Sequence, residues 1–498
     1  MNTDGSDTPG SFPFTSGIHT DGYLTKSWKV MQYSGFGTAS EANSNFHRLL
    51  NSGASGISIA FDLPTQMGIS PDSELGSVEC GKVGVSIETL DDMSELLKDI
   101  DLENTHISMT INATAPMLLL LVQLVAEKRG YDPTQMRGTL QNDILKEFIS
   151  RNTYIFPPKE SIDLTTQIFQ YCQKELPSWN PISVSGYHFE EAGATPAQEV
   201  GFAISNAIEY LRSANGRELD LELLASKFTF FFSSTENVIE QVCKFRAART
   251  IWAYIMKNDF GFTNSKTQRM RIHAQTAGSE LTFKDPINNI ARTTLQALGA
   301  ILGGVQSLHT NSLNEAHSIP TELTSGIAMN IQHIIRHETD ITQHSDLFDG
   351  SKAISDLTSK LVLEINEVLD LIESYGGARK AVEKNIQKNL IEQNAHLMQL
   401  KFESGNKLIV GLNYGLKLPK QEGSIDLHFN SVLNDNPLTG VRYGQRKHSI
   451  ESALEYVELL KQAENILYPI KQMLSEGYTV SQISEVLKKI YGEYNVTI

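Results

Sequence analysis

The chain contains 498 residues, of which 40% are hydrophobic, 8% aromatic and 20% charged, the composition of an ordinary globular protein. The length fits one (β/α)8 barrel, which takes roughly 250 residues or more, together with a smaller unit. The 42 basic and 58 acidic side chains give a net charge of −16, which argues against non-specific binding to nucleic acid or to an anionic membrane. Three cysteines far apart in the chain exclude a disulfide scaffold and indicate a reducing compartment: Cys80, Cys172 and Cys243.

Neither end of the chain predicts a membrane segment or a secretion signal. The opening MNTDGSDTPGSFPF is acidic and rich in turn residues, unlike a signal peptide. The longest apolar run, Met117–Ala126, is about half of what a membrane-spanning helix needs and predicts a buried helix. We therefore expect a soluble, cytoplasmic protein with no membrane partner.

Short β-rich runs alternate with helix-length stretches over about 310 residues. Such alternation predicts a parallel sheet. The seven strands come close to the eight of a closed barrel, so we predict an α/β fold, a (β/α)8 TIM barrel with a C-terminal helical extension. A doubly wound open sheet is the alternative. The predicted strands are Gly56–Asp62, His106–Asn112, Gly138–Gln141, Ile182–His188, Lys227–Ser233, Arg271–Thr276 and Val305–Thr310.

Several helices have recognisable starts. Thr38 and Glu41 form a capping-box pattern, and Pro286 is predicted at the first position of a helix whose apolar residues form one stripe from Ile287 to Leu302. Residues 351–404 read as helices broken at Gly376-Gly377, and 449–494 as amphipathic helix, whereas 415–448 read as a linker. The predicted domains are a barrel with its N-terminal segment over 1–415, and a linker and C-terminal helical region over 416–498.

The two faces of each predicted strand differ in polarity. Side chains alternate between faces along a strand, which puts Ile57, Ile59 and Phe61 opposite Ser58, Ala60 and Asp62. The other strands place Ser108, Thr110, Ser183, Ser185, Thr229, Ser233, His273 and Gln275 on corresponding faces. If the apolar faces meet the helices, the barrel interior is a polar tunnel able to hold a long, thin ligand rich in amides. An antiparallel sheet with one wet face is the alternative.

The isolated short motifs in this sequence are only weak evidence of a function. Gly35-Phe-Gly37 faintly resembles a dinucleotide loop but is better explained as a turn before a helix, and His333 and His337 have the spacing of zinc ligands without a third ligand. Polar clusters at strand ends are more informative, because barrel enzymes carry catalytic groups there. Arg151 reads equally as a helix C-terminal charge or as a clamp for a carboxylate. His188 reads as a structural histidine or as a hydrogen-bond donor to a substrate carbonyl.

Long motifs in a fixed order carry a family resemblance. They are MQYSGFGTASEAN (31–43), GISIAFDLPT (56–65), GTLQNDILKEFISRNTYIFPP (138–158), SGYHFEEAGAT (185–195), KFRAART (244–250), HAQTAG (273–278) and QSLHTNSLNEA (306–316). Together they resemble the catalytic barrel of the cobalamin-dependent acyl-CoA mutases, specifically the methylmalonyl-CoA mutase family, over about residues 14–415. In that family the pantetheine arm of coenzyme A threads a tunnel lined by serine and threonine.

The resemblance also implies site residues. The catalytic set comprises a tyrosine between substrate and cofactor, an arginine for the substrate carboxylate, a histidine on the thioester carbonyl and two neighbours: Tyr33, Arg151, His188, Tyr187 and Gln141. The substrate-binding set lines the acyl-CoA channel: Ser58, Ser108, Thr110, Thr139, Asn180, Lys227, His273 and Gln275. The positions near the adenosyl group or corrin are Gly35, Glu191, Gln306 and Glu315. No metal is expected to be held by this chain itself.

The implied reaction is a radical rearrangement in which adenosylcobalamin supplies the radical and the carbonyl-CoA group migrates to the adjacent carbon. The family's cobalt-binding Asp-x-His-x-x-Gly is only Asp426-Leu-His428-Phe-Asn-Ser431 here, with no α/β domain after it. The resemblance therefore implies a separate cobalamin-binding subunit and a hetero-oligomer. Lys29 and Met31 replace coenzyme A contacts, and Lys227 replaces an arginine. Lysine still meets a phosphate as a point charge, but methionine does not.

Tyr33 with Arg151 is the carboxylate-reading pair of methylmalonyl-type enzymes, whereas isobutyryl-type relatives have phenylalanine and glutamine. We therefore expect interconversion of methylmalonyl-CoA and succinyl-CoA. The alternatives are an isobutyryl-CoA or ethylmalonyl-CoA type of mutase large subunit, and a non-catalytic partner subunit of a heteromeric mutase. Retention of Tyr33, Arg151, Tyr187 and His188 argues against the last.

Overall fold

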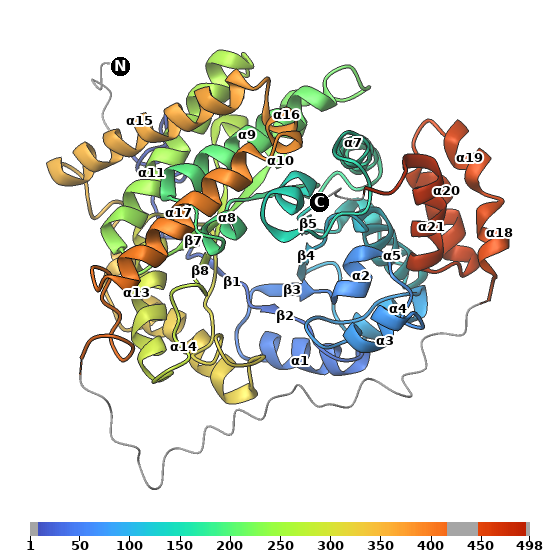
Figure 1. The fold of residues 1–498 in the computed structure, drawn as a ribbon, viewed down its shortest axis with the longest axis horizontal. Helices are drawn as coiled ribbons and strands as arrows, with labels where there is room; N and C mark the ends of the chain where they lie inside the picture. The colour runs from blue at the N-terminus through green and yellow to red at the C-terminus, as the bar shows by residue number, and fades with distance from the viewer. Residues whose placement is uncertain (1–7, 416–446, 495–498) are drawn as a thin grey trace, which may run out of the picture. The chain divides into compact units, whose positions relative to one another are not determined.

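The computed structural model describes residues 8–415 and 447–494 (Figure 1). The chain divides into two compact units. Unit 1 is drawn from Met1–Val30, Ser185–Ser205 and Thr229–Leu433, and unit 2 from Met31–Val184, Asn206–Phe228 and Asn434–Ile498. Within the described ranges, no helix is both long and apolar enough to cross a bilayer. Most of the predicted linker at 415–448, with Asp426 and His428, lies outside the described residues.

Unit 2 contains a four-stranded parallel sheet in the order β2-β3-β4-β5. Its strands are β2 (Tyr33–Ser34), β3 (Gly56–Ala60), β4 (His106–Thr110) and β5 (Gly138–Leu140). Its helices, which Figure 1 draws in blue to teal except for the green α10, are α1 (Ala39–Asn51), α2 (Leu63–Met67), α3 (Glu74–Glu79), α4 (Leu90–Leu96), α5 (Ala115–Lys128), α6 (Ile144–Lys146), α7 (Pro158–Glu175) and α10 (Leu221–Lys227).

Two local predictions for unit 2 are confirmed. The side chain of Thr38 accepts a hydrogen bond from the amide of Glu41, and the Glu41 carboxylate accepts one from the Thr38 amide, which completes the capping box of α1. Every residue of α5 from Ala115 to Ala126 is buried, so the apolar run is a core helix. Its one polar member, Gln123, accepts a hydrogen bond of 2.8 Å from the hydroxyl of Tyr171.

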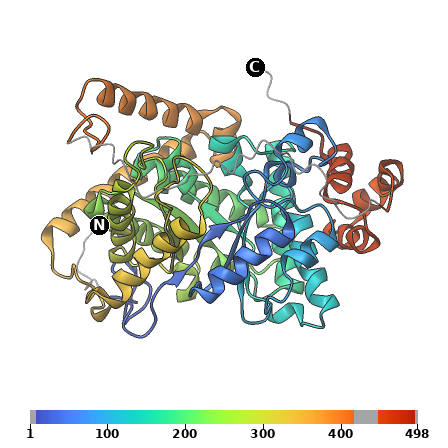
Figure 2. The same cartoon turned by 90° about the horizontal axis from the view of Figure 1, so that it is seen from below.

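The C-terminal helices belong to unit 2 and pack against its helices α5 and α7; Figures 1 and 2 draw them in red. Lys471 forms a 2.6 Å ion pair with Glu127 in α5, and the side-chain amide of Asn465 donates to the carbonyl of Gln167 in α7 over 2.8 Å. The amphipathic region is therefore four helices: α18 (Ile450–Leu454), α19 (Val457–Gln462), α20 (Leu467–Glu476) and α21 (Val480–Tyr491).

Unit 1 is built on a five-stranded sheet in the order β1-β9-β8-β7-β6. The strands are β1 (Lys29–Val30), β6 (Ser183–Ser185, which ends in this unit), β7 (Thr229–Ser234), β8 (Ile272–Thr276) and β9 (Ser307–His309). The helices are α8 (Tyr187–Glu191), α9 (Pro196–Ala214, which runs on into unit 2), α11 (Val238–Tyr254), α12 (Ser265–Gln268), α13 (Asn288–Leu302), α14 (Glu322–His337), α15 (Lys352–Ser374), α16 (Ala378–Glu383) and α17 (Ile386–Glu403).

The start of α13 differs from the prediction. Asp285 has a φ of 51°, outside the helical region, so the helix begins at Asn288 and not at Pro286. The predicted apolar stripe is only partly buried, because Ile287 and Leu295 are 47% and 45% exposed whereas Ile301 is 1% exposed. The buried face combines small apolar residues with polar ones, among them Asn289, Thr293 and Gln296. The predicted break at Gly376-Gly377 between α15 and α16 is confirmed, with φ of 89° and 98°.

All seven predicted strands are present, several of them shorter than predicted. The ladders β1–β9, β2–β3, β3–β4, β4–β5, β7–β8 and β8–β9 are parallel, so the antiparallel alternative is wrong. Two further strands, β1 and β2, lie near the N-terminus and have only two residues each, too few to show alternation. The fold is thus α/β with two parallel sheets. Among the described strands no closed barrel is seen, and the barrel stays a prediction.

Gly138, the first residue of β5, allows a close approach of the sheet to a core tryptophan. A Cβ atom there would lie 2.2 Å from the ring of Trp179, which is 1% exposed and cannot move aside. We expect Gly138→Ala to lower the free energy of unfolding by about 1–3 kcal/mol, measured by urea denaturation. Gly326→Ala in α14 is the control, because no atom lies within 4 Å and alanine favours a helix by roughly 0.5–1 kcal/mol. A loss at Gly326 as large as that at Gly138 would contradict this account.

Candidate functional site

The register of unit 2 brings five predicted site residues into one row across the sheet. Tyr33 pairs with Ser58, Ser58 with Ser108, Ser108 with Thr139, and Thr139 with Asn180. Residues paired in this way point to the same face of a sheet. The opposite face of β3 and β4 carries apolar side chains that are at most 1% exposed, namely Ile57, Ile59, Ile107 and Met109. The predicted division into a polar and an apolar face is therefore confirmed in unit 2.

The polar row is tied together by side-chain hydrogen bonds. The hydroxyl oxygen of Thr139 accepts a 3.0 Å hydrogen bond from the side-chain amide of Asn180 and lies 3.2 Å from Nε2 of His106. Two residues further along these strands, Ala60 is paired with Thr110, and the backbone amide of Gln141 donates to the carbonyl of Met109. Thr110 and Gln141 thus lie beyond the first row, toward the carboxyl end of the sheet.

The backbone geometry explains why residue 35, directly after β2, is a glycine. A Cβ atom at this position would lie 2.1 Å from the carbonyl oxygen of Ala60. Only glycine therefore allows the approach to β3, whatever binds nearby.

Arg151 ends a short π-helix, Glu147–Arg151, that continues α6. The turn is closed by a 2.7 Å bond from the amide of Asn152 to the carbonyl of Glu147, and Asn152 adopts a left-handed φ of 58°. π-Helical turns are rare and frequently occur at functional sites. The side chain of Arg151 is exposed, so no burial penalty argues for a carboxylate partner. Its position in the last turn also matches the helix-end alternative.

Tyr187 and His188 open α8 directly after β6, so the predicted strand ends earlier than His188. Nδ1 of His188 lies 2.7 Å from the hydroxyl of Ser185, which fixes the orientation of the imidazole. The ring of Tyr187 is stacked on Phe231, with centroids 4.8 Å apart and planes 8° apart. Its hydroxyl accepts a 2.9 Å hydrogen bond from the side-chain amide of Gln275.

Phe231 is the centre of an aromatic cluster in unit 1. Besides Tyr187, it meets His188 edge-on at 5.8 Å and His273 at 5.1 Å. The register places Phe231, His273, Ser307 and Lys29 in one row across β7, β8, β9 and β1. Nδ1 of His273 lies 2.8 Å from the Ser307 hydroxyl, and burial lowers the pKa of His273, which keeps the ring neutral at pH 7.

Glu191 and Glu315 form an acidic pair beyond the carboxyl end of β8. Glu191 accepts hydrogen bonds from the backbone amides of Gly278 and Ser279, over 2.8 and 3.1 Å. Burial raises the pKa of Glu191, and desolvation together with the Glu191 charge raises the pKa of Glu315. Each carboxylate can accept a hydrogen bond from a hydroxyl group of a ligand.

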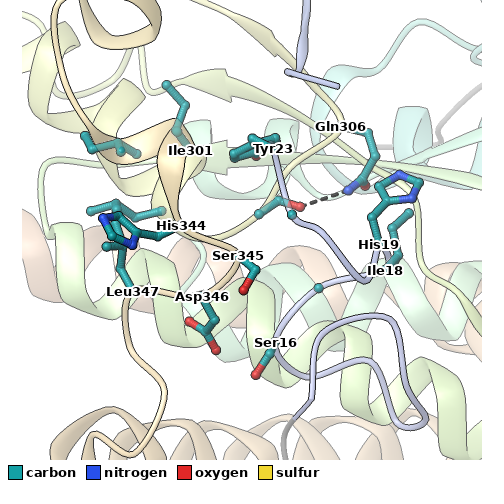
Figure 3. Close-up of a pocket in the computed structure, with 15 residues that line it drawn as sticks. Ser16, Ile18, His19, Tyr23, Ile301, Gln306, His344, Ser345, Asp346 and Leu347 are labelled. Atoms are coloured by element: carbon teal, nitrogen blue, oxygen red, sulfur yellow. Dashed lines mark hydrogen bonds between the residues drawn. The ribbon is translucent and has the colours of Figure 1, made fainter. Parts of the chain in front are cut away.

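Gln306 lies at the other end of the sheet, because it precedes β9. Its side-chain oxygen accepts from the amide of Ile272 over 2.7 Å, and its nitrogen donates to the carbonyl of Gly304 over 2.9 Å. Figure 3 shows Gln306 beside His19 in a cavity of about 50 Å³. Gln306 therefore does not gather with Glu191 and Glu315, and strand direction in the sequence could have revealed this.

Lys227 is the last residue of α10, two residues before β7, and not part of a strand as predicted. The sequence did not identify five residues of these clusters as site residues, although strand alternation places the first of them on an inward face: Ser185, Phe231, Asn112, Lys146 and Glu147. His333 and His337 stack at 6.0 Å. Residues 8–415 and 447–494 contain no group of three or more side chains suited to a metal ion.

Comparison with known proteins points to the same family as the sequence motifs. The family model described as Methylmalonyl-CoA mutase matches residues 1–493. The chain is 37% identical to the 2-hydroxyisobutanoyl-CoA mutase large subunit of Aquincola tertiaricarbonis, covering 98% of this chain and 88% of that protein. It is 36% identical to the methylmalonyl-CoA mutase large subunit of Propionibacterium freudenreichii subsp. shermanii, covering 98% and 68%, and 36% identical to methylmalonyl-CoA mutase of Escherichia coli (strain K12), covering 98% and 69%. The chain belongs to the methylmalonyl-CoA mutase family, whose members are isomerases of the intramolecular transferase class.

Proposed function

We propose that the chain is the large subunit of an adenosylcobalamin-dependent mutase that interconverts methylmalonyl-CoA and succinyl-CoA in the cytoplasm. The observation that carries the proposal is the row of Tyr33, Ser58, Ser108, Thr139 and Asn180 on one face of a parallel sheet. Small hydroxyl and amide groups in such a row offer hydrogen bonds along an extended thioester and its pantetheine arm. An aliphatic barrel core would leave no room for such a ligand.

We also propose that the two sheets are arcs of one (β/α)8 barrel. Only two residues separate β1 from β2, so together they count as one interrupted strand. With β3 to β9 they make eight strands, and the two sheet orders follow the chain in cyclic sequence. The pairing of β1 with β9, the first strand with the last, is the ladder that closes a ring. An open doubly wound sheet has no such ladder.

Each site residue then has a role derived from its surroundings. Arg151 is an exposed, planar donor for the free carboxylate of the acyl group, and Tyr33 lies at one end of the polar row. His188, held by Ser185, donates a hydrogen bond to the thioester carbonyl, and Tyr187 packs beside it on Phe231. The channel residues Thr110, Lys227, His273 and Gln275 complete the acyl-CoA contacts. Water is excluded by the aromatic cluster, which suits a reaction that free solvent would quench.

The acidic pair fits the adenosyl part of the cofactor. Carboxylates accept hydrogen bonds from ribose hydroxyls, and Glu191 is already fixed by two backbone amides. Gly35 and Gln306 are explained by their own strands and do not support a cofactor contact. Bound adenosylcobalamin would supply the radical chemistry that none of these side chains provides.

A separate cobalamin-binding subunit is in keeping with the printed name of one relative, the 2-hydroxyisobutanoyl-CoA mutase large subunit, which is 37% identical to this chain. The same relative favours a second candidate, a mutase for a branched acyl-CoA without a free carboxylate. Arg151 favours the dicarboxylic substrate, because a guanidinium forms a bidentate, charge-assisted pair with a free carboxylate, which a branched acyl group of this kind lacks.

The test is to assay the purified chain, alone and with a cobalamin-binding subunit and adenosylcobalamin, against a panel of acyl-CoA thioesters. We expect interconversion of methylmalonyl-CoA and succinyl-CoA only in the complete mixture. Turnover of isobutyryl-CoA or 2-hydroxyisobutanoyl-CoA in place of methylmalonyl-CoA would favour the second candidate. Absence of turnover on the whole panel, in a complex shown to bind the cofactor, would refute a catalytic role.

A further inference from the structure

A buried cluster of polar residues in unit 2 holds the side chain of Gln141. The residues are Asn112, Lys146, Glu147 and Thr153, and none of them belongs to the predicted site. Gln141 is 4% exposed, and the side chains of Lys146 and Glu147 are each 1% exposed. Burying two charges is costly unless they are paired and hydrogen-bonded, so both charged groups need partners within the cluster.

The cluster determines which way the Gln141 amide faces. Its oxygen accepts a 3.0 Å hydrogen bond from Nζ of Lys146 and a 2.9 Å hydrogen bond from Nδ2 of Asn112. An ammonium group only donates, so the atom that faces Lys146 has to be the amide oxygen, and two donors fill its two lone pairs. The NH2 group therefore points away from Lys146, and within residues 8–415 and 447–494 it donates to no side chain or carbonyl.

The partners of Gln141 are themselves fixed. Glu147 Oε1 lies 2.5 Å from Nζ of Lys146 and accepts from Nδ2 of Asn112 over 2.5 Å, while its other oxygen accepts from the hydroxyl of Thr153. The side-chain oxygen of Asn112 accepts from the amide of Asp143 over 2.9 Å. Burial lowers the pKa of Lys146, and the Glu147 carboxylate counteracts that effect. Every charged group of the cluster thus has its partner, as a stable buried network requires.

The backbone places this cluster next to the candidate carboxylate clamp in the chain. Lys146 ends α6, and Glu147 begins the π-helix whose last residue is Arg151. Residues 146 and 147 are buried while residue 151 is exposed. One short segment therefore supplies both the support for Gln141 and the exposed guanidinium.

We propose that Lys146 and Asn112 are positioning residues that lock the Gln141 amide with its NH2 group toward the acyl group. The substrate must then present an acceptor oxygen at this point, which excludes a donor or an apolar group there. The inference rests on the proposed function and deepens it, since it makes Gln141 an obligate hydrogen-bond donor in the acyl pocket.

A double-mutant cycle on kcat/KM for methylmalonyl-CoA tests this, using the full chain with its cobalamin-binding subunit. Lys146→Met combined with Glu147→Gln removes both buried charges together. We expect it to lower kcat/KM on the order of 10–100-fold in the parent and to cause no further loss when Gln141→Ala is already present. A purely structural role of Lys146 predicts the same loss in both backgrounds, which would overturn the proposal. Lys352→Met with Asp356→Asn, an exposed pair in α15, is the matched control and should change nothing.

A second variant covers the case in which the charge-free pair does not fold. Gln141→Glu can accept both inward hydrogen bonds but presents an oxygen where the NH2 group was. We expect a lower melting temperature, because a second carboxylate is buried beside Glu147, and a loss in kcat/KM on the order of 100-fold at a temperature where the variant stays folded. Unchanged turnover would overturn the proposal.

The two failures can be told apart. If the parent complex turns over no acyl-CoA, both the proposed function and this inference are refuted. If the parent is active and the losses caused by the Lys146–Glu147 pair variant and by Gln141→Ala are additive, only the positioning role is refuted.

Discussion

Replacing Arg151 by glutamine is expected to lower kcat/KM for methylmalonyl-CoA on the order of 10²–10³-fold while adenosylcobalamin binding stays within about twofold. A bidentate guanidinium–carboxylate pair carries two charge-assisted hydrogen bonds, and glutamine offers at most one neutral donor in its place. The measurements are steady-state kinetics of the complete complex and titration of the cofactor. Equal turnover by the variant and the parent would reject the carboxylate clamp.

Because Arg151 is exposed, the test can separate an effect on activity from an effect on stability. The side chain is exposed at the end of a π-helix, so its loss should change the free energy of unfolding by no more than about 0.5 kcal/mol. Arg212→Gln is a matched control, because Arg212 is also exposed and also lies in the last turn of a helix, α9. If both variants lost the same activity, the effect would belong to helix ends and not to the substrate. Arg151→Lys should recover part of the loss, since it keeps the charge without the planar fork.

The polar rows were predictable from the sequence because they depend only on the two-residue period of a strand. Ser58, Ser108 and Thr139 lie on one face as soon as their strands are correctly assigned, and parallel pairing then aligns them. β1 and β2 were not predictable in this way, because two residues cannot show a period. Tyr33 could therefore be assigned to the site by resemblance but not placed beside Ser58.

The residues that hold the site residues in place could not be predicted from the sequence, for a different reason. Lys146 and Glu147 are adjacent charges, which ordinarily lie on a solvated helix surface, and only the local π-helix and Asn112 make their burial possible. Likewise, the polar face of α13 is buried because the Asn289 side chain donates to the carbonyls of Thr282 and Leu313, each over 2.9 Å. Hydropathy alone predicts that the apolar stripe is buried. The sequence does not show which backbone carbonyls need a hydrogen-bond donor, and these carbonyls bring the polar side chain of Asn289 into the interior.

The largest loss of stability is expected at a second buried ion pair, in unit 1. Nζ of Lys244 lies 2.6 Å from Oε2 of Glu199 and donates to the carbonyl of Ser233 over 2.9 Å, and both charged side chains are 0% exposed. Lys244→Met keeps the volume but leaves the Glu199 carboxylate buried with only the Ser233 amide, 2.6 Å away, as its partner. The free energy of unfolding should fall by about 3–5 kcal/mol.

Urea denaturation of the purified chain measures this loss, and its linear extrapolation resolves a difference of that size. Lys352→Met is the control, because the Lys352–Asp356 pair is 86% and 65% exposed and should contribute less than about 0.5 kcal/mol. Combining Lys244→Met with Glu199→Gln removes the stranded charge, so the double variant should recover part of the loss although it has no ion pair at all. That recovery separates the cost of an unpaired buried charge from the value of the pair itself. A double variant as unstable as Lys244→Met would show that packing, and not charge, holds Glu199 and Ser233 together.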